Sequence, residues 1–240
     1  MEEKKSNEDI EKSIRKKFHK TIWSRFVKAI KEYQLIQEGD RIAVCISGGK
    51  DSMLMAKLFQ ELQRHRGIPF EVKFLVMDPG YKTENRQLIE SNAAQMNIPL
   101  DIFETNIFNA VVNIEKSPCY LCARMRRGHL YKNAQDLGCN KIAYAHHKDD
   151  VVVTMLMSLI YEGRFHTFSP VTYLDRMDLT VIRPLMYVNE ADVIGFVNKN
   201  EVPVVKSPCP ADGNTRREYV TQLLAQLNRE NPGVKERMFT

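Results

Sequence analysis

The chain has 240 residues, of which 43% are hydrophobic and 27% charged, and its formal net charge is +5. A chain of this length can bury a sizeable core in one domain with at most a small appendage. No apolar run approaches the roughly 20 residues that span a bilayer, and the N-terminus is charged and lacks the apolar core of a signal peptide. We therefore expect a cytoplasmic protein with no membrane partner.

The positive charge is concentrated in two segments. Residues 1–31 hold ten Lys or Arg against five Asp or Glu, which accounts for the whole net charge. Residues 116–135 hold five more basic residues and no acid. Two such patches suit a polyanion larger than a nucleotide, and RNA is the obvious candidate. Solvated helix faces produce such runs as often, so charge alone leaves both interpretations open.

The first predicted element is an N-terminal helix. Six apolar residues recur there at every fourth position: Ile10, Ile14, Phe18, Ile22, Phe26 and Ile30. This spacing predicts an amphipathic helix whose apolar stripe needs a partner. We therefore divide the chain into a basic N-terminal helix, residues 1–36, and a main domain, residues 37–240. The stripe can pack on the main domain or on a second copy of the chain, so a homodimer is one expectation.

The next element is a strand over residues 41–47, which runs directly into a glycine pair and a helical pattern. Gly48 and Gly49 let the backbone N–H groups approach an anion closely. The N-terminus of the following helix adds its dipole and its unpaired N–H donors. Two hydroxyls and one ammonium group complete a predicted phosphate site: Ser47, Ser52 and Lys50. The spacing is not that of the Walker motif, and a glycine-rich turn without a ligand would have the same local fold.

Strands and helices alternate along the rest of the chain. Helices are predicted over residues 53–64, 83–96, 122–137, 149–161, 190–199 and 216–228. Strands are predicted over residues 72–77, 100–103 and 141–145, and a hairpin over 171–174 and 179–182. This alternation indicates an α/β fold with a doubly wound, mainly parallel sheet, whose ligands bind at the carboxyl ends of the strands.

Polar residues follow three predicted strands, at residues 47–52, at Asp78 and at residues 146–150. Because parallel strands end at one edge of a sheet, these loops should face one cleft. Asp149 or Asp150 could hold magnesium, since hard carboxylate oxygens suit that ion, and we take Asp150 as the candidate ligand. Asp149 and Asp150 can also cap the following helix, and capping is the favoured role for Asp149. Asp78 can accept from an adenine amino group or a ribose hydroxyl, or it can form the turn before Pro-Gly.

Two adjacent histidines open the third of these loops. His146 and His147 can each donate to a phosphate or position a substrate, and the sequence does not say which of them faces the cleft. We assign His147 to the predicted ATP site, together with Asp78 and Asp150.

The five cysteines are an odd number for a reducing compartment, so no disulfide framework is expected. Cys45 lies in an apolar strand and Cys139 follows a helix-stopping glycine, so both are predicted to be packing residues. Cys119 and Cys122 have Cys-x-x-Cys spacing, and Cys209 lies in a Pro-Cys-Pro loop. Three thiolates suit an iron–sulfur cluster with one open iron, a zinc ion completed by a further ligand, or unliganded redox thiols. The spacing alone does not choose among these.

Several motifs together resemble a known family. Residues 47–52 have the sequence Ser-Gly-Gly-Lys-Asp-Ser, which is similar to the SGGxDS loop of the PP-loop ATP pyrophosphatases, whose fold is adenine nucleotide alpha hydrolase-like. The wider set resembles the tRNA 2-thiocytidine synthetase (TtcA) family: this loop, residues 118–128, residues 146–150, and Arg-Pro-Leu at 183–185 followed by Glu190. The likeness runs from about Ile36 to Phe239.

The resemblance implies an ATP-dependent tRNA sulfurtransferase. Members of that family use ATP, Mg²⁺ and a three-cysteine 4Fe-4S cluster to install sulfur at C2 of an anticodon-loop cytidine. A cysteine desulfurase or free sulfide would be the sulfur donor. Residues 47–52 would bind pyrophosphate, with Asp51 as a catalytic residue. Carried over by position, the cluster ligands would be Cys119, Cys122 and Cys209, and the groups that contact RNA phosphate or the adenylate would be Arg124, Arg126 and Arg127.

Two other functions are compatible with part of this pattern. The first is a PP-loop ligase of the lysidine synthetase type, which adenylates a tRNA cytidine and adds an amine without sulfur chemistry. The three-cysteine set argues against it. The second is a nucleotide-binding iron–sulfur redox sensor, against which the basic patches and the complete pyrophosphate loop argue.

Overall fold

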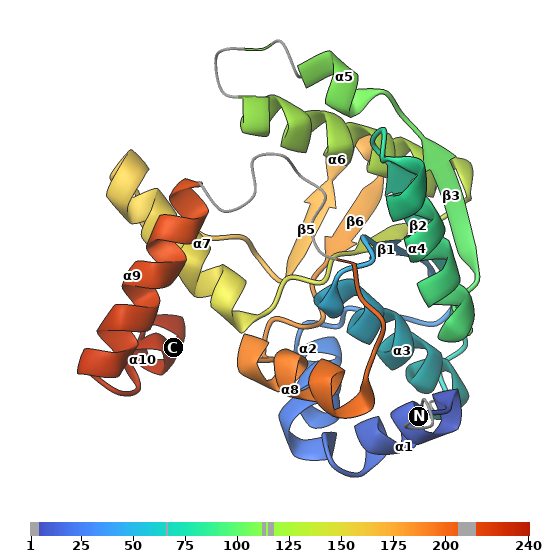
Figure 1. The fold of residues 1–240 in the computed structure, drawn as a ribbon, viewed down its shortest axis with the longest axis horizontal. Helices are drawn as coiled ribbons and strands as arrows, with labels where there is room; N and C mark the ends of the chain where they lie inside the picture. The colour runs from blue at the N-terminus through green and yellow to red at the C-terminus, as the bar shows by residue number, and fades with distance from the viewer. Residues whose placement is uncertain (1–4, 66, 112–113, 115–117, 206–214) are drawn as a thin grey trace.

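The structure is a computed structural model that describes residues 5–65, 67–111, 114, 118–205 and 215–240, with the backbone alone at 118–119. Within these residues, six strands form one sheet in the order β3-β2-β1-β4-β6-β5 (Figure 1). The strands are β1 (Arg41–Ile46), β2 (Glu71–Asp78), β3 (Leu100–Glu104), β4 (Lys141–Ala143), β5 (Val171–Leu174) and β6 (Leu179–Ile182). All neighbours are parallel except the β5–β6 pair, which is antiparallel. The predicted doubly wound, mainly parallel sheet and its hairpin are confirmed.

The central strand β1 is apolar because helices cover both faces of the sheet. Ile42, Ala43 and Val44 are all fully buried. Helices α3 (Lys50–His65) and α8 (Glu190–Asn200) pack on one face, and α6 (Pro118–Asp136) packs on the other. Figure 1 shows α6 above the sheet, and α3 and α8 below it. Helix α4 (Thr83–Gln95) follows β2, and the short α5 (Ile107–Val111) follows β3.

Three helices form a second, smaller cluster beside the sheet. They are α7 (Lys148–Glu162), α9 (Arg216–Glu230) and α10 (Val234–Phe239). Val152, Leu156 and Leu224 are among the buried residues that hold these helices together. Figure 1 shows this lobe at the left, where α7 runs away from the sheet edge and α9 lies along α7. None of the helices in the described residues has the length and apolarity needed to cross a membrane.

The N-terminal segment differs from the single helix that its spacing predicts. It consists of α1 (Asn7–Arg15), a π-helical turn η1 (His19–Trp23) and α2 (Ser24–Glu32). In a continuous α-helix, a strict four-residue spacing drifts by about 40° per repeat, so over five repeats the stripe would rotate by about 200°. The segment is not a continuous α-helix, because a turn at residues 16–18 and the wider π turn interrupt it and change the rotation of the stripe. All six stripe residues consequently remain at most 8% exposed.

The apolar stripe packs on the core of its own chain. Its residues belong to the same buried cluster as β1, α3 and α8. The stripe therefore provides no surface for a homodimer, and the reason for expecting a dimer there is removed. The division of the chain at residue 36 stays a prediction.

Candidate functional site

The strand order reverses between β1 and β4, and this is where open α/β sheets bind ligands. β1 ends at Ile46 and leads through the glycine loop into α3. β4 ends at Ala143 and leads through the two histidines into α7. The two loops therefore lie side by side at the carboxyl edge of the sheet, as the sequence predicts.

The conformation of the loop requires glycine at position 48. Gly48 has φ +79°, and an added Cβ would lie 2.9 Å from Cγ1 of Ile89 and 3.3 Å from Cγ2 of Val205. The backbone N–H of Val205 donates to the carbonyl of Gly48 at 2.9 Å. The loop is thus held between α4 and the segment that follows α8, which leaves its outer side for a ligand.

The two serines of the loop hydrogen-bond to each other and to the loop backbone. The Ser52 hydroxyl accepts from the backbone N–H of Ser47 at 3.2 Å and donates to the carbonyl of Gly49 at 2.9 Å. Ser52 is buried, whereas Ser47 is exposed. Ser47 is therefore the better placed of the two to meet a phosphate, while Ser52 stabilises the loop.

Lys50 lies between two carboxylates at the start of α3. Its Nζ is 2.9 Å from Oδ2 of Asp51 and 2.9 Å from Oε1 of Glu190. Burial by itself would lower the pKa of Lys50, but the two carboxylates raise it above its ordinary value, so the ammonium stays charged. The other carboxylate oxygen of Asp51, Oδ1, is buried and has no hydrogen-bond partner among the described residues. That oxygen is available to a donor or cation on a ligand.

His147 and Asp150 close the N-terminus of α7. The backbone N–H of His147 donates to Oδ2 of Asp150 at 2.9 Å, and Arg217 of α9 pairs with Oδ1. Nε2 of His147 lies 3.7 Å from Oδ1 of Asp51, which connects the two loops. Burial by itself would raise the pKa of Asp150, but His147 and Arg217 hold it below its ordinary value. Asp150 is therefore an anion in the folded protein.

The favoured role of Asp149 as the cap of α7 is wrong. Its Oδ2 accepts from the backbone N–H of Glu190 at 2.8 Å, so it caps α8, and its Oδ1 pairs with Nζ of Lys235 at 2.6 Å. The third residue of α7 is Asp150, and a side chain at that position can reach back to the N-cap N–H. Despite burial, the backbone donor and Lys235 hold the pKa of Asp149 below its ordinary value. Asp149 ties α7, α8 and α10 together.

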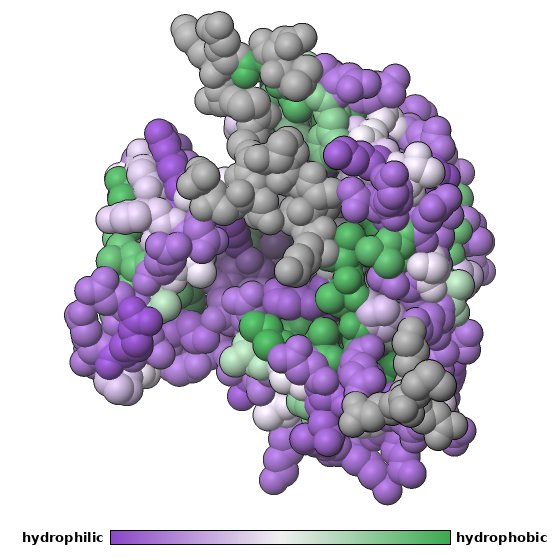
Figure 2. Space-filling view, in the orientation of Figure 1, coloured by the Kyte–Doolittle hydropathy of each residue, from purple (hydrophilic) through white to green (hydrophobic). Residues whose placement is uncertain are grey.

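A cavity and a groove meet at these side chains. The cavity, of about 690 Å³, lies between the loops, α6 and the segments just before β5 and just after β6. The groove, of about 570 Å³, lies between the N-termini of α7 and α8 and the helices α9 and α10. Asp51 and Asp150 line both. Figure 2 shows the notch between the α9–α10 lobe and the main body. Each volume lies in the range of sites for nucleotides and other small ligands.

Of the two histidines, His146 is the one that lines the larger cavity. Its ring lies 4.9 Å from that of Phe168, and its Nδ1 is buried without a hydrogen-bond partner among the described residues. Burial lowers the pKa of His146 to about 4, so the imidazole is neutral near pH 7. His147, which we assigned to the ATP site, lines the groove instead.

Of the three predicted arginines of α6, two line the cavity. Arg126 and Arg127 do so, whereas Arg124 is exposed and does not belong to the lining. The guanidinium of Arg126 lies 5.5 Å from the ring centroid of Phe108, and its buried Nε has no hydrogen-bond partner among the described residues. Arg126 therefore keeps a donor for a ligand.

Sequence reasoning did not place Arg183 in the site. Its guanidinium lies 5.0 Å from the ring centroid of Phe168, and its Nε is buried without a hydrogen-bond partner among the described residues. Burial lowers the pKa of Arg183 below its ordinary value. A signal was present, because Arg183 directly follows the predicted strand 179–182 at the ligand-binding edge of the sheet.

Asp78 lies beside the cavity and does not line it. Its Oδ1 accepts from the backbone N–H groups of Gly80 and Tyr81 at 2.9 and 2.7 Å, and its Oδ2 lies 3.4 Å from Arg86. These contacts form the turn before α4, which is the structural alternative that the sequence left open. Asp78 lines a separate hollow of about 440 Å³. A contact between Asp78 and ATP stays a prediction.

Only one of the three predicted cluster cysteines is described with its side chain. Cys122 is a free, half-buried thiol in α6, and the side chain of Cys119 and the whole of Cys209 lie outside the described residues. Within the described part of the chain, no group of three or more His, Cys, Asp or Glu residues is placed to hold a metal ion. Cys139 is buried, and burial raises its thiol pKa to about 11, which agrees with the predicted packing role. Cys45 lies in the wall of the cavity, and burial raises its thiol pKa.

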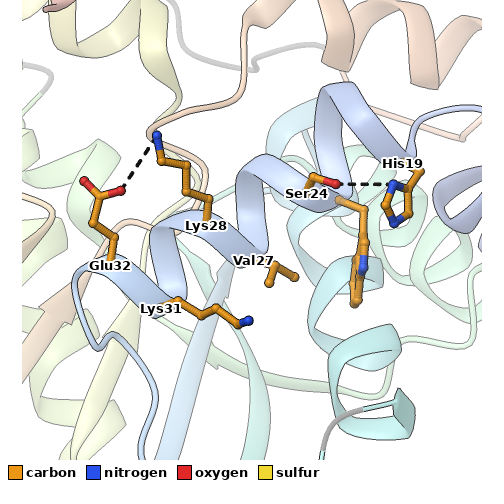
Figure 3. Close-up of a pocket in the computed structure, with 7 residues that line it drawn as sticks. His19, Ser24, Val27, Lys28, Lys31 and Glu32 are labelled. Carbon is orange, nitrogen blue, oxygen red and sulfur yellow. Dashed lines mark hydrogen bonds and ion pairs between the residues drawn. The ribbon is translucent and has the colours of Figure 1, made fainter.

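A further hollow, of about 560 Å³, lies on the N-terminal helices (Figure 3). Trp23 and Val27 form its apolar part, and Lys31 and the Lys28–Glu32 pair, 3.8 Å apart, lie at its edge. None of the loops at the strand ends contributes to its lining. It is therefore separate from the candidate site.

The glycine loop, the reversal of strand order and the cavity beside them define a nucleotide-binding α/β domain. A family model described as a PP-loop domain matches residues 18–227. The tRNA-cytidine(32) 2-sulfurtransferase of Citrifermentans bemidjiense is 37% identical over 225 residues, which cover 91% of this chain and 88% of that protein. The protein of the same name from Legionella pneumophila is 36% identical over 215 residues, which cover 88% of this chain and 76% of that protein. The chain belongs to the tRNA 2-thiocytidine synthetase family of PP-loop sulfurtransferase enzymes.

Solved structures share the fold. The U34-tRNA thiolase NcsA from Methanococcus maripaludis, solved with its 4Fe-4S cluster, aligns with a TM-score of 0.72 over 90% of this chain and 75% of that one, at 22% identity. The NH3-dependent NAD synthetase from Campylobacter jejuni aligns with a TM-score of 0.51 over 92% of this chain and 90% of that one, at 17% identity. These likenesses support the α/β architecture described above.

Proposed function

We propose that this protein is an ATP-dependent tRNA sulfurtransferase that replaces the C2 oxygen of an anticodon-loop cytidine with sulfur. The observation that carries the proposal is that the loop of residues 47–52 and helix α6, which begins at the cysteine pair, line one cavity of about 690 Å³. Relatives that match 91% of the chain and are named tRNA-cytidine(32) 2-sulfurtransferase support the same activity. Their name makes cytidine 32 the first target to test.

ATP supplies the activation that this reaction needs, because the C2 oxygen of cytosine is a poor leaving group. Attack of that oxygen on the α-phosphorus of ATP releases pyrophosphate and converts the oxygen into part of AMP. A sulfur nucleophile can then attack C2 and displace AMP. The N–H groups of residues 47–52 at the N-terminus of α3 suit the pyrophosphate. Lys50, held in its charged form, adds a positive charge there.

The carboxylates at the junction of cavity and groove suit magnesium. Asp150 and the unpartnered Oδ1 of Asp51 offer the hard oxygens that this ion prefers. In the present arrangement Arg217 neutralises Asp150. Magnesium at Asp150 would therefore compete with Arg217 for the carboxylate. When bound, the ion would neutralise charge on the phosphates of ATP.

Cys119, Cys122 and Cys209 would hold the 4Fe-4S cluster, since soft thiolates are the usual ligands of iron–sulfur centres. The thiol of Cys122 is free and half-buried, so it fits this role. When bound by these three cysteines, the cluster would supply the sulfur chemistry of the transfer. The related fold of the U34-tRNA thiolase is known with a 4Fe-4S cluster, which supports the choice of iron over zinc.

The described residues next to the cysteines lie in or beside the cavity and the adjoining groove. Ala123, which follows Cys122, lines the cavity. Val205, the last described residue before the segment that contains Cys209, is bonded to Gly48 of the glycine loop. Thr215, the first described residue after that segment, lines the adjoining groove.

Arginines of α6 would bind the RNA. Arg126 and Arg127 line the cavity, so they can contact the adenylate or the phosphates next to the target base, and the exposed Arg124 can contact phosphates outside it. The sulfur donor would be a cysteine desulfurase or free sulfide. A tRNA substrate of this kind places the reaction in the cytoplasm.

The first test is the iron, acid-labile sulfide and zinc content of protein purified without oxygen, together with its absorption spectrum. We expect about four irons and four sulfides per chain, and their loss in Cys122→Ala and Cys209→Ala but not in the control Cys139→Ala. Asp51→Ala should keep the cluster and lose ATP-dependent thiolation, measured by mass spectrometry of tRNA nucleosides. One zinc without iron would refute the cluster assignment. Protein without metal that joins an amine to tRNA would show a ligase of the lysidine synthetase type.

A further inference from the structure

An exposed aromatic residue lies next to the lining of the cavity in the sequence. Phe165 is 80% exposed, more than the other large hydrophobic residues of the described chain. The next residue, His166, lines the cavity, and so does Phe168. Phe165 thus lies one residue from the cavity wall, on the side where α7 ends.

The loop that carries Phe165 is braced at several points. Gly163 ends α7 in the left-handed conformation with φ +63°, and the backbone N–H of Arg164 donates to the carbonyl of Ser158 at 3.2 Å. The Thr167 hydroxyl donates to the carbonyl of Val151 at 3.0 Å. Phe168 then packs against His146 in the cavity. Because the residues on both sides of Phe165 are held by these contacts, the fold keeps the Phe165 ring exposed to solvent.

Further apolar and basic groups surround this position on α7 and α9. The guanidinium of Arg216 lies 4.8 Å from the ring centroid of Tyr161. Neither Arg164 nor Arg216 has a carboxylate partner among the described residues. Figure 2 shows hydrophobic surface on this lobe. The exposed large apolar residues here are Leu159, Ile160, Tyr161, Phe165 and Tyr219.

A base that reacts inside a cavity must leave the stack of its own strand. Its neighbours in the strand then lose a stacking partner, and an aromatic ring beside the cavity can replace it. The phosphates on either side of the target base must pass this part of the surface, where guanidinium groups without a carboxylate partner would attract them. Arginines without a carboxylate partner, next to exposed aromatic rings, suit RNA better than a second copy of this chain, which would bring the same positive charges.

We propose that Phe165 stacks on the nucleotide next to the target base, and that Arg164 and Arg216 contact the flanking phosphates. This inference rests on the proposed function and adds to it the residues that hold the RNA strand beside the cavity. Phe165 is a positioning residue, because it acts on the neighbouring nucleotide and not on the reacting atoms.

The test uses the full-length, cluster-loaded protein and a tRNA anticodon stem-loop with 2-aminopurine next to the target cytidine. Stacking on Phe165 should quench the 2-aminopurine emission. Phe165→Ala should abolish this quenching and weaken RNA binding about 5- to 150-fold, while the KM for ATP stays unchanged. Phe165→Trp should restore both. Tyr173→Ala, at a residue that is 56% exposed and outside the cavity lining, is the matched control.

Two results would overturn the inference. In the first, Phe165→Ala keeps the wild-type RNA affinity and the quenching. In the second, the wild-type protein sediments as a dimer, Phe165→Ala sediments as a monomer, and RNA affinity does not change, so that the surface binds a second copy. A wild-type protein that does not thiolate tRNA would refute the proposed function instead. A thiolating wild type with an unaffected Phe165→Ala variant would refute only the role of Phe165.

Discussion

The substitution Gly48→Ala should destabilise the fold at the phosphate loop. Gly48 has φ +79°, and this left-handed conformation costs an L-residue about 1–2 kcal/mol. The new Cβ would also lie 2.9 Å from Ile89 and 3.3 Å from Val205, and overpacking of this kind adds about 1–3 kcal/mol. We therefore expect the free energy of unfolding to fall by about 2–5 kcal/mol. For a chain of this size that lowers Tm by roughly 4–20 °C.

Gly39→Ala is the matched control for this prediction. Gly39 has φ +81°, and an added Cβ there would meet nothing within 4 Å. Gly39→Ala should therefore cost only the free energy of placing an L-residue in the left-handed conformation, about 1–2 kcal/mol. Urea unfolding of both variants and of the wild type, without ATP, measures the difference. If Gly48→Ala is no less stable than Gly39→Ala, the close packing of the loop against Ile89 and Val205 is refuted.

Two further predictions concern buried charge. Lys57 is fully buried and its Nζ lies 2.8 Å from Oε1 of Glu11, so Glu11→Ala should lower the free energy of unfolding by about 3–5 kcal/mol. Adding Lys57→Met should recover most of that loss in urea unfolding, and a double variant no more stable than Glu11→Ala would contradict this. Burial lowers the pKa of His146 to about 4, whereas an imidazole in the unfolded chain titrates near 6.5. The unfolded chain therefore binds a proton that the folded protein does not, and stability falls as pH drops from about 6.5 toward 4. His146→Phe should remove about 1–2 kcal/mol of the loss between about pH 7 and pH 5, and an unchanged pH dependence would show that His146 is accessible to protons in the folded state.

Much of the site follows from local sequence. The glycine pair after an apolar strand predicts an anion-binding turn, because the conformation of such a turn depends only on residues close together in the sequence. Alternation of strands and helices predicts a parallel sheet, and parallel strands end at one edge. The prediction that residues 47–52 and 146–150 lie side by side therefore required no knowledge of long-range contacts.

Other features depend on packing between distant segments. The partners of Lys50 and Asp150, Glu190 and Arg217, are far away in sequence, and no periodicity relates them. The role of Asp149 is set by the position of α8, which places the backbone N–H of Glu190 within reach of its carboxylate. For the same reason, the sequence did not show that His146 rather than His147 lines the larger cavity.

The N-terminal segment shows both sides of this division. Its four-residue spacing correctly identified which six side chains are buried. The spacing did not reveal the π turn at His19–Trp23 or the surface that covers the stripe. Hydrophobic periodicity specifies which face of a segment avoids water, and it does so locally. What that face packs against, and how the backbone adjusts to stay in contact, depends on the shape of the assembled core.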